Sequence, residues 1–150
     1  MVPDKGATLK LRAEDAEDLA VISACLQDAL VAVRDLAYAP EERSFLLVAN
    51  RFRWENGLVP APGEVAYERV LCGITFSEVA AVSYSGFRRS DDGRILSLLA
   101  IRPEDRLAHL EFSGGAAIRL EVARILCHAR DLGDPWPTPW QPRHDLDEVS

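Results

Sequence analysis

Two pairs of arginines have the side-chain chemistry to bind an anion. Arg51 and Arg53 alternate with Phe52 and Trp54 in the stretch RFRWE, and a second pair stands in the later stretch FRRSDDG. Alternate residues of a strand share a face, so the aromatic pair would face the core and the arginines would face out. A guanidinium group binds carboxylate or phosphate through parallel hydrogen bonds. We therefore predict that a patch formed by Arg51, Arg53, Arg88 and Arg89 binds an anionic ligand; the alternative is a solvated sheet face paired with nearby acids.

A second candidate is the aromatic stretch DLGDPWPTPWQPRH, residues 131–144, which holds two of the three tryptophans and four of the nine prolines. This composition argues against a helix and against an ordinary strand. The stretch either wraps back over the domain, so that Trp136 and Trp140 fill gaps at a sheet, offers a polyproline ligand to a protein partner, or joins two copies in a homodimer. In the second and third cases Trp136 and Trp140 are the predicted binding residues.

Patterns that usually carry catalysis are missing from the sequence. The three histidines have no second histidine or cysteine at a metal-ligand spacing, and C-x-x-C does not occur. SYSGF is not a nucleophile elbow, and Gly114-Gly115 lacks the residues of a phosphate loop. Each cysteine lies in an apolar pattern, where burial raises the thiol pKa. We predict no catalytic residue, no metal and no cofactor, and we lean against an enzyme.

Length and composition limit the partners. The chain has 150 residues, 48% of them hydrophobic, which is enough for a single domain (1–150) with a core of its own. Its formal net charge of −7 repels nucleic-acid phosphates and anionic lipid. No stretch approaches ~18 uninterrupted apolar residues, and the three cysteines are odd in number. We therefore predict a cytoplasmic protein with neither a nucleic-acid nor a membrane partner.

Hydrophobic periodicity predicts the elements that position these residues. Acidic residues crowd the start of residues 13–29, and Leu19, Ile22 and Leu26 then recur at helical spacing, which indicates an amphipathic helix. Strands follow where the period changes to two. We predict them at about 9–12, 30–38, 44–55, 68–76, 79–87, 95–101, 107–112 and 116–122, with a hairpin between the second and third and a kink at Ser77-Glu78.

The segment after Val122 shows another change of period. Four apolar residues from Val122 to Ala129 step by 3, 1 and 3, which favours a closing helix over about 123–132 that ends at Gly133. A further strand is the alternative, because apolar residues alternate from Ile118 to Val122. The predicted fold is therefore α+β: a curved antiparallel sheet or half-open barrel, such as a pleckstrin-homology-like barrel, with an N-terminal helix, a C-terminal helix and an extended tail over 134–150.

Several stretches resemble a known family. LQDALVAVRDLAY, ANRFRWE, LSLLAI, GGAAIRLEV and DLGDPWPTPWQPRH are similar to the small bacterial proteins catalogued as domain of unknown function 2948. RFRWE and the tryptophan-proline stretch are the most specific parts of a resemblance that covers nearly the whole chain. The resemblance implies a cytoplasmic bacterial protein without an established activity. Taken with the missing catalytic patterns, it leads us to predict a non-enzymatic protein-binding or adaptor module; the alternative is a binder of anionic small molecules, or an enzyme, with an arginine-lined sheet mouth.

Overall fold

The computed structural model describes residues 8–54, 59–61 and 64–138, which form ten strands, one α-helix and one short 3-10 turn. In chain order these elements are β1 (Lys10–Ala13), α1 (Ala16–Cys25), β2 (Leu30–Ala39), β3 (Ser44–Phe52), β4 (Val59–Ala61), β5 (Glu64–Phe76), β6 (Val79–Ser85), β7 (Ile95–Glu104), β8 (Leu107–Phe112), η1 (Ser113–Gly115), β9 (Ala117–Val122) and β10 (Cys127–Thr138).

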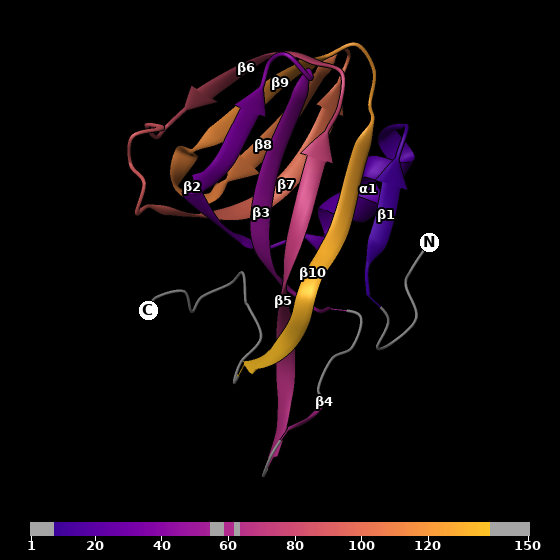
Figure 1. Cartoon of the computed structure of the whole chain (residues 1–150), viewed down its shortest axis with the longest axis vertical. Helices are drawn as coiled ribbons and strands as arrows, with labels where there is room; N and C mark the ends of the chain where they lie inside the picture. Colours follow the sequence, from indigo (N-terminus) through magenta and orange to yellow (C-terminus); the bar gives the residue numbers. More distant parts are fainter. Residues whose placement is uncertain (1–7, 55–58, 62–63, 139–150) are drawn as a thin grey trace.

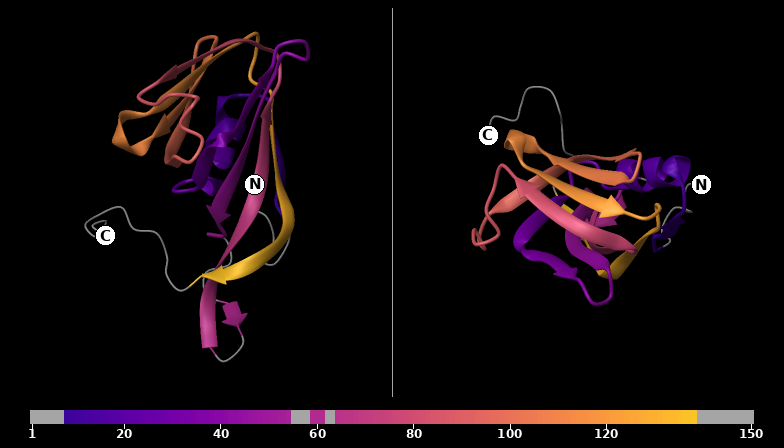
Figure 2. Two further views of the ribbon diagram at one scale, coloured as in Figure 1. Left: turned by 60° about the vertical axis from the view of Figure 1, so that its left-hand side comes forward. Right: turned by 90° about the horizontal axis from the view of Figure 1, so that it is seen from above.

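The strands form one open antiparallel sheet in the order β1-β10-β5-β3-β2-β7-β8-β9-β6, with β4 added to the far end of β5. β2 and β7 pair over only three residues, Leu30–Ala32 on β2, and the sheet bends at this junction. Strands β7, β8, β9 and β6 therefore form a second layer behind β10, β5, β3 and β2 (Figures 1 and 2). β1 and β6 are the two edges of the sheet.

The core lies between the two layers and is built by alternation along each strand. On β3 the side chains of Phe45, Leu47 and Ala49 are buried and point to the core. α1 adds Leu19 and Ile22 to this cluster from its place beside β1 and β7. Its first turn is capped by the Asp15 carboxylate, which accepts a hydrogen bond from the Asp18 N–H (2.8 Å).

Side chains of β6 and of the turn after it contact β2 and β3, with which β6 forms no backbone ladder. The Tyr84 ring of β6 lies 6.5 Å from the Phe45 ring, centroid to centroid. Arg89 donates to the Leu36 carbonyl at 3.0 Å and to the Tyr84 hydroxyl at 3.2 Å, and its guanidinium carbon lies 5.2 Å from the centre of the Tyr84 ring. Tyr38 donates to the Val79 carbonyl at 2.9 Å.

The predicted α+β fold with a helix at each end is wrong. Residues 127–132, placed in a closing helix, are the first half of β10, and α1 is the one α-helix among the described residues. Cys127 and Ala129 are buried while His128 and Arg130 are exposed, a period of two that fits a strand. A half-open or pleckstrin-homology-like barrel capped by a terminal helix is likewise not formed, because the sheet stays open.

The aromatic stretch also begins as a strand, against expectation. β10 continues to Thr138 beside β5, and its register shifts between Leu132 and Trp136. Gly133 adopts a positive φ of 70° inside this bulge, which allows the strand to continue past Pro135. The predicted tail over 134–150 is thus in β10 for its first five residues, and Trp140 lies outside the described residues.

Candidate binding face

Arg51 is not at the surface, contrary to the prediction that it faces out. It is the largest fully buried side chain, because it continues the core-facing series of alternate residues on β3. Its Nε and Nη2 donate to the two carboxylate oxygens of Asp131, each at 2.8 Å. The Leu9 N–H donates to Asp131 Oδ2 at 2.9 Å. This buried ion pair therefore joins β3 and β10 across β5 and anchors the residue before β1.

The other three predicted arginines do not join Arg51 in a patch. Arg53 is also buried, and its Nη1 lies 2.6 Å from Glu68 Oε1. Arg89 is held against the ring of Tyr84 on the second layer, and Arg88 stands beside it in an exposed turn. The aromatic residue between the buried arginines, Phe52, is fully buried on the opposite side of the sheet from the main core, where Arg69 lies across its ring at 5.9 Å.

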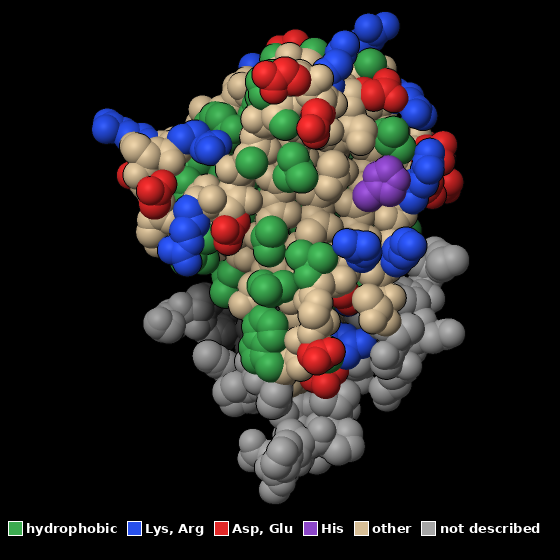
Figure 3. Space-filling view, in the orientation of Figure 1, with side chains coloured by type: hydrophobic (Ala, Val, Ile, Leu, Met, Phe, Trp, Pro, Cys, Tyr) green, Lys and Arg blue, Asp and Glu red, His purple; other side chains and the backbone are tan. Residues whose placement is uncertain are grey.

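The outer face of β3, β5 and β10, which points away from the core, carries an apolar column. Leu46 is 39% exposed and Leu71 is 42% exposed. Half-buried Val48 and Leu132 stand on the same face, because the register places Val48 opposite Gly73 and Leu132 opposite Leu71. Trp136 lies opposite Arg69 at the lower end of this face and is 37% exposed. We define the apolar column as Leu46, Val48, Leu71, Leu132 and Trp136; Figure 3 shows hydrophobic side chains running down this face.

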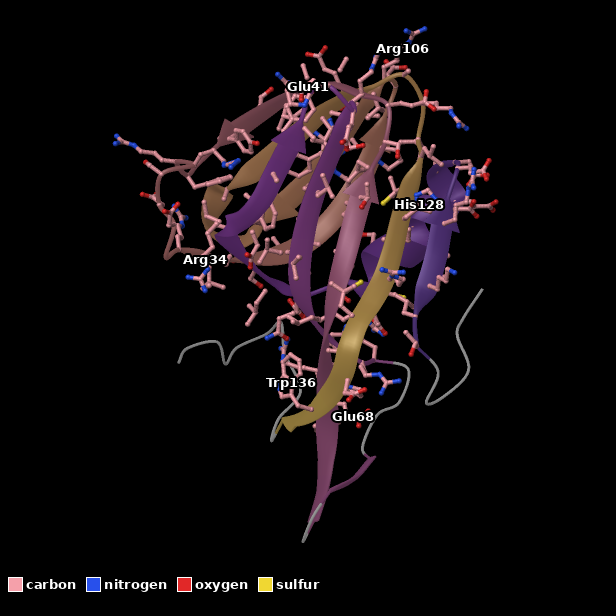
Figure 4. The ribbon with its side chains drawn as sticks, viewed as in Figure 1. Arg34, Glu41, Glu68, Arg106, His128 and Trp136 are labelled. Carbon is pink, nitrogen blue, oxygen red and sulfur yellow. The ribbon has the colours of Figure 1, made fainter. Side chains whose placement is uncertain are left out.

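Three cationic side chains and a histidine stand beside the column on the β1–β10 edge. Lys10 pairs directly with Arg130, and Arg12 pairs directly with His128, so all four point to the outer face. All four are exposed. Figure 3 shows the histidine with Lys and Arg side chains around it, and Figure 4 labels His128 on β10. Like charges directly opposite each other destabilise a strand pair, so the Lys10–Arg130 pair is not explained by the stability of the sheet.

Most of these cations are uncompensated by protein groups. Arg12 forms an exposed ion pair with Glu14, at 2.7 Å between Nε and Oε2. Among the described residues, no carboxylate pairs with the side chains of Lys10, His128 or Arg130. The outer face therefore presents a net positive charge within a chain whose overall charge is −7.

A shallow hollow of about 300 Å³ lies between these cations and the column. Gly73 supplies part of its floor, because it has no side chain at the point where Val48 and Arg130 stand on either side. Lys10, Thr75, His128 and Arg130 line it with nitrogen and hydroxyl donors. Such a hollow can receive a small anionic group.

The model of the family described as protein of unknown function DUF2948 matches residues 9–144. The chain belongs to this family. No curated protein and no solved structure matches it significantly, so the role of this DUF2948 protein has to be argued from its own side chains. The resemblance seen in the sequence is thereby confirmed at the level of the family.

Sequence reasoning missed the outer face of the DUF2948 chain. A helix over 123–132 would have separated His128 from Arg130, whereas a strand puts both on one side. The apolar column also left a signal: FLLV at 45–48 and VL at 70–71 are unbroken apolar runs, where a strand with one solvated face alternates. A single core cannot bury every residue of either run, because successive side chains of a strand point to opposite faces of the sheet.

Three further observations concern metal ligands, membrane spans and thiols in the described residues. No group of three or more His, Cys, Asp or Glu side chains there could hold a metal ion, and no helix among them is long and apolar enough to cross a membrane. Burial raises the pKa of the Cys72 thiol to about 12 and also raises the pKa of Cys127. Both thiols are therefore protonated at neutral pH, as the apolar patterns around them predict.

Thiol labelling tests the prediction that Cys72 and Cys127 are buried and protonated. At pH 8 the folded protein is expected to react with iodoacetamide only at half-buried Cys25, because Cys72 and Cys127 are buried and protonated. The folded pKa of Cys72 lies above its unfolded value of ~8.5, so its contribution to stability is complete below that pH and is lost as the pH rises toward about 12. Mass spectrometry counts the labels; rapid labelling of Cys72 in the folded state would contradict the assignment, and unfolded protein should carry three.

Proposed function

We propose that this DUF2948 protein is a non-enzymatic protein-binding module, and that its outer sheet face takes an extended segment of another protein that is both acidic and apolar. The observation that carries the proposal is the apolar column beside cations without protein partners. Exposed apolar patches with a polar rim mark interaction sites in soluble proteins. The free thiols of all three cysteines are consistent with a reducing, cytoplasmic location, which we propose together with a bacterial origin.

The apolar column favours a polypeptide over a small molecule. Its large side chains belong to three adjacent strands, β3, β5 and β10, and they cover an open face of the sheet. A flat apolar strip of this kind matches alternate side chains of an extended segment, whose spacing repeats that of the strands below it. Trp136 belongs to the apolar column, so the proposed binding surface includes the described part of the aromatic stretch.

The charges on the face favour an acidic partner over a second copy of the chain. Two copies packed face to face would bring two surfaces of like net charge together, and these would repel each other. An acidic segment would instead pair with Lys10 and Arg130 and relieve their repulsion across β1 and β10. The predicted homodimer through the tail is therefore the less favoured arrangement.

Peptide selection tests the proposal without knowledge of the natural partner. Peptides selected from a random display library against the full chain are expected to be enriched in both carboxylates and large apolar residues. The variant Leu71→Thr keeps a strand-forming residue but removes apolar surface, and it should weaken the selected peptides by about tenfold, as loss of an interface anchor does. Fluorescence polarisation measures the dissociation constants.

The chain offers a matched control for this variant. Leu99 on β7 is 42% exposed, the same exposure as Leu71, but lies three strands away from β5. Leu99→Thr should change peptide affinity by less than about twofold. Selection of basic peptides, or equal loss of affinity in the two variants, would contradict the proposal.

A further inference from the structure

We propose that the hollow over Gly73 is an oxyanion site that binds a phosphate dianion. Its source is either a free phosphate-containing metabolite or a phosphorylated side chain of the partner segment. The inference rests on the proposed function only for the second source, because the hollow and its donors do not depend on the apolar column.

The shape of the hollow comes from a glycine in the middle of a long strand. Glycine weakens a strand interior, and where it occurs there it often marks the close approach of a ligand or another chain. A Cβ atom built on Gly73 would lie 3.3 Å from Leu132 Cδ1, the tip of a flexible side chain, and it would extend from the floor of the hollow. The backbone of Gly73 has no positive φ, so the conformation itself does not require glycine.

The donors around the hollow come from three adjacent strands. Lys10 on β1 and Arg130 on β10 are directly paired and bring an ammonium and a guanidinium group to the same side. Thr75 on β5 and His128 on β10 are also directly paired, and they add a hydroxyl and an imidazole at the next position along the strands. The register of β1, β10 and β5 therefore places four donor groups around one space of about 300 Å³.

The charge of the site favours a dianion over a single carboxylate. Lys10 and Arg130 supply two permanent positive charges, and no acidic side chain of the described residues pairs with either of them. Two acidic side chains near the start of α1 have partners of their own: Glu14 pairs with Arg12, and Asp18 accepts a hydrogen bond from the Glu14 N–H. A phosphate group carries up to two negative charges at neutral pH and offers several acceptor oxygens, so it matches both the charge and the number of donors.

Titration of the isotope-labelled full chain with inorganic phosphate tests the site directly. Amide shifts in nuclear magnetic resonance spectra are expected to move at Lys10, Gly73, Thr75 and Arg130, with saturation, while sodium chloride at the same ionic strength leaves them in place. Arg130→Gln should weaken phosphate by about fivefold, the effect of ~1 kcal/mol for a partly exposed charge. Arg34→Gln makes the same change of charge on β2, at the left of Figure 4 and away from β1 and β10, and should leave the affinity unchanged.

Gly73→Ala separates shape from charge. The variant keeps every cation and fills the floor of the hollow. If phosphate binds inside the hollow, its affinity for the variant falls; if phosphate is only attracted to the surface by the overall charge, its affinity stays the same. The spectrum and the urea midpoint of the Gly73→Ala variant show whether it has folded. If it does not fold, Lys10→Gln is the second test of the site, and it should weaken phosphate binding as much as Arg130→Gln does. Shifts that chloride reproduces, or equal weakening in Arg130→Gln and Arg34→Gln, would overturn the proposal.

Two further titrations identify the source of the phosphate. An acidic, leucine-containing peptide with one phosphoserine and its unphosphorylated form are compared on the full chain. Tighter binding of the phosphopeptide, lost in Arg130→Gln, assigns the site to a modified partner. Equal binding of the two peptides, with inorganic phosphate still bound, assigns it to a small metabolite. Phosphate binding without any peptide binding would retain this inference and reject the proposed function.

Discussion

Replacing Asp131 by alanine is expected to lower the free energy of unfolding by about 3–5 kcal/mol. The variant removes the two carboxylate oxygens that accept from the Nε and Nη2 of the fully buried Arg51 side chain. It also removes the acceptor of the Leu9 N–H. A buried cation without its counter-ion is costly, because the protein interior replaces water poorly as a solvent for charge. Urea denaturation followed by circular dichroism measures the loss.

Two further variants serve as controls for the loss of stability in Asp131→Ala. Asp134→Ala removes a carboxylate of the same strand that is exposed, so it should change stability by less than about 0.5 kcal/mol. The double variant Arg51→Met with Asp131→Leu removes both charges and should recover most of the stability lost in Asp131→Ala. A cost below about 1 kcal/mol for Asp131→Ala alone would show that the pair does not hold β3, β10 and the start of β1 together.

The second large effect is expected from Leu47→Ala, next to a residue where the same change should cost little. Leu47 is 2% exposed and faces the core, so truncation should lower stability by about 2–5 kcal/mol. Leu46, its neighbour on β3, is 39% exposed on the outer face, and Leu46→Ala should cost less than about 0.5 kcal/mol. Thermal and urea unfolding measure both variants under the same conditions.

The contrast separates folding from binding along one strand. If Leu46 contributes little to stability, its large apolar side chain on an open face needs another reason, and the outer-face proposal supplies one. A cost for Leu46→Ala similar to that for Leu47→Ala would mean that the outer face is covered within the protein itself, and the apolar column would then be part of a second core.

Much of the strand pattern can be predicted from the sequence, since local signals were clear. The predicted hairpin of β2 and β3 forms. The predicted kink at Ser77-Glu78 separates β5 from β6, with Glu78 at a positive φ of 57°. β8 and β9 also pair as predicted. Strand order could not be predicted, because β10 enters between β1 and β5 from the far end of the chain.

The misplaced closing helix has a specific cause. Ile125 and Leu126 are both half-buried in the connection before β10, and their adjacency gave the helical spacing that was read across the boundary. The true pattern, from Cys127 to Asp131, alternates buried and exposed residues but contains a buried aspartate, which does not register as apolar. Asp131 is buried only because Arg51 meets it across β5, a contact that no local pattern reports.

The arginine patch was misplaced by a choice between two faces. FLLVAN is apolar on both faces of β3, so the strand has no clear alternation until Arg51. The prediction placed Phe52 on the core side of β3, whereas the alternation that starts at Phe45 places Arg51 on the core side. The predicted binding role of Trp136 remains a prediction, now supported by its place at the end of the apolar column.

The central claim is that the outer face of β3, β5 and β10 is the binding surface. Mapping a selected acidic and apolar peptide by nuclear magnetic resonance on the labelled full chain tests it most directly. The claim predicts that amide shifts gather at Leu46, Val48, Leu71, Gly73 and Arg130, and that β8 and β9 of the second layer stay unchanged. Shifts that gather on β8 and β9 while the outer face stays unchanged would contradict it.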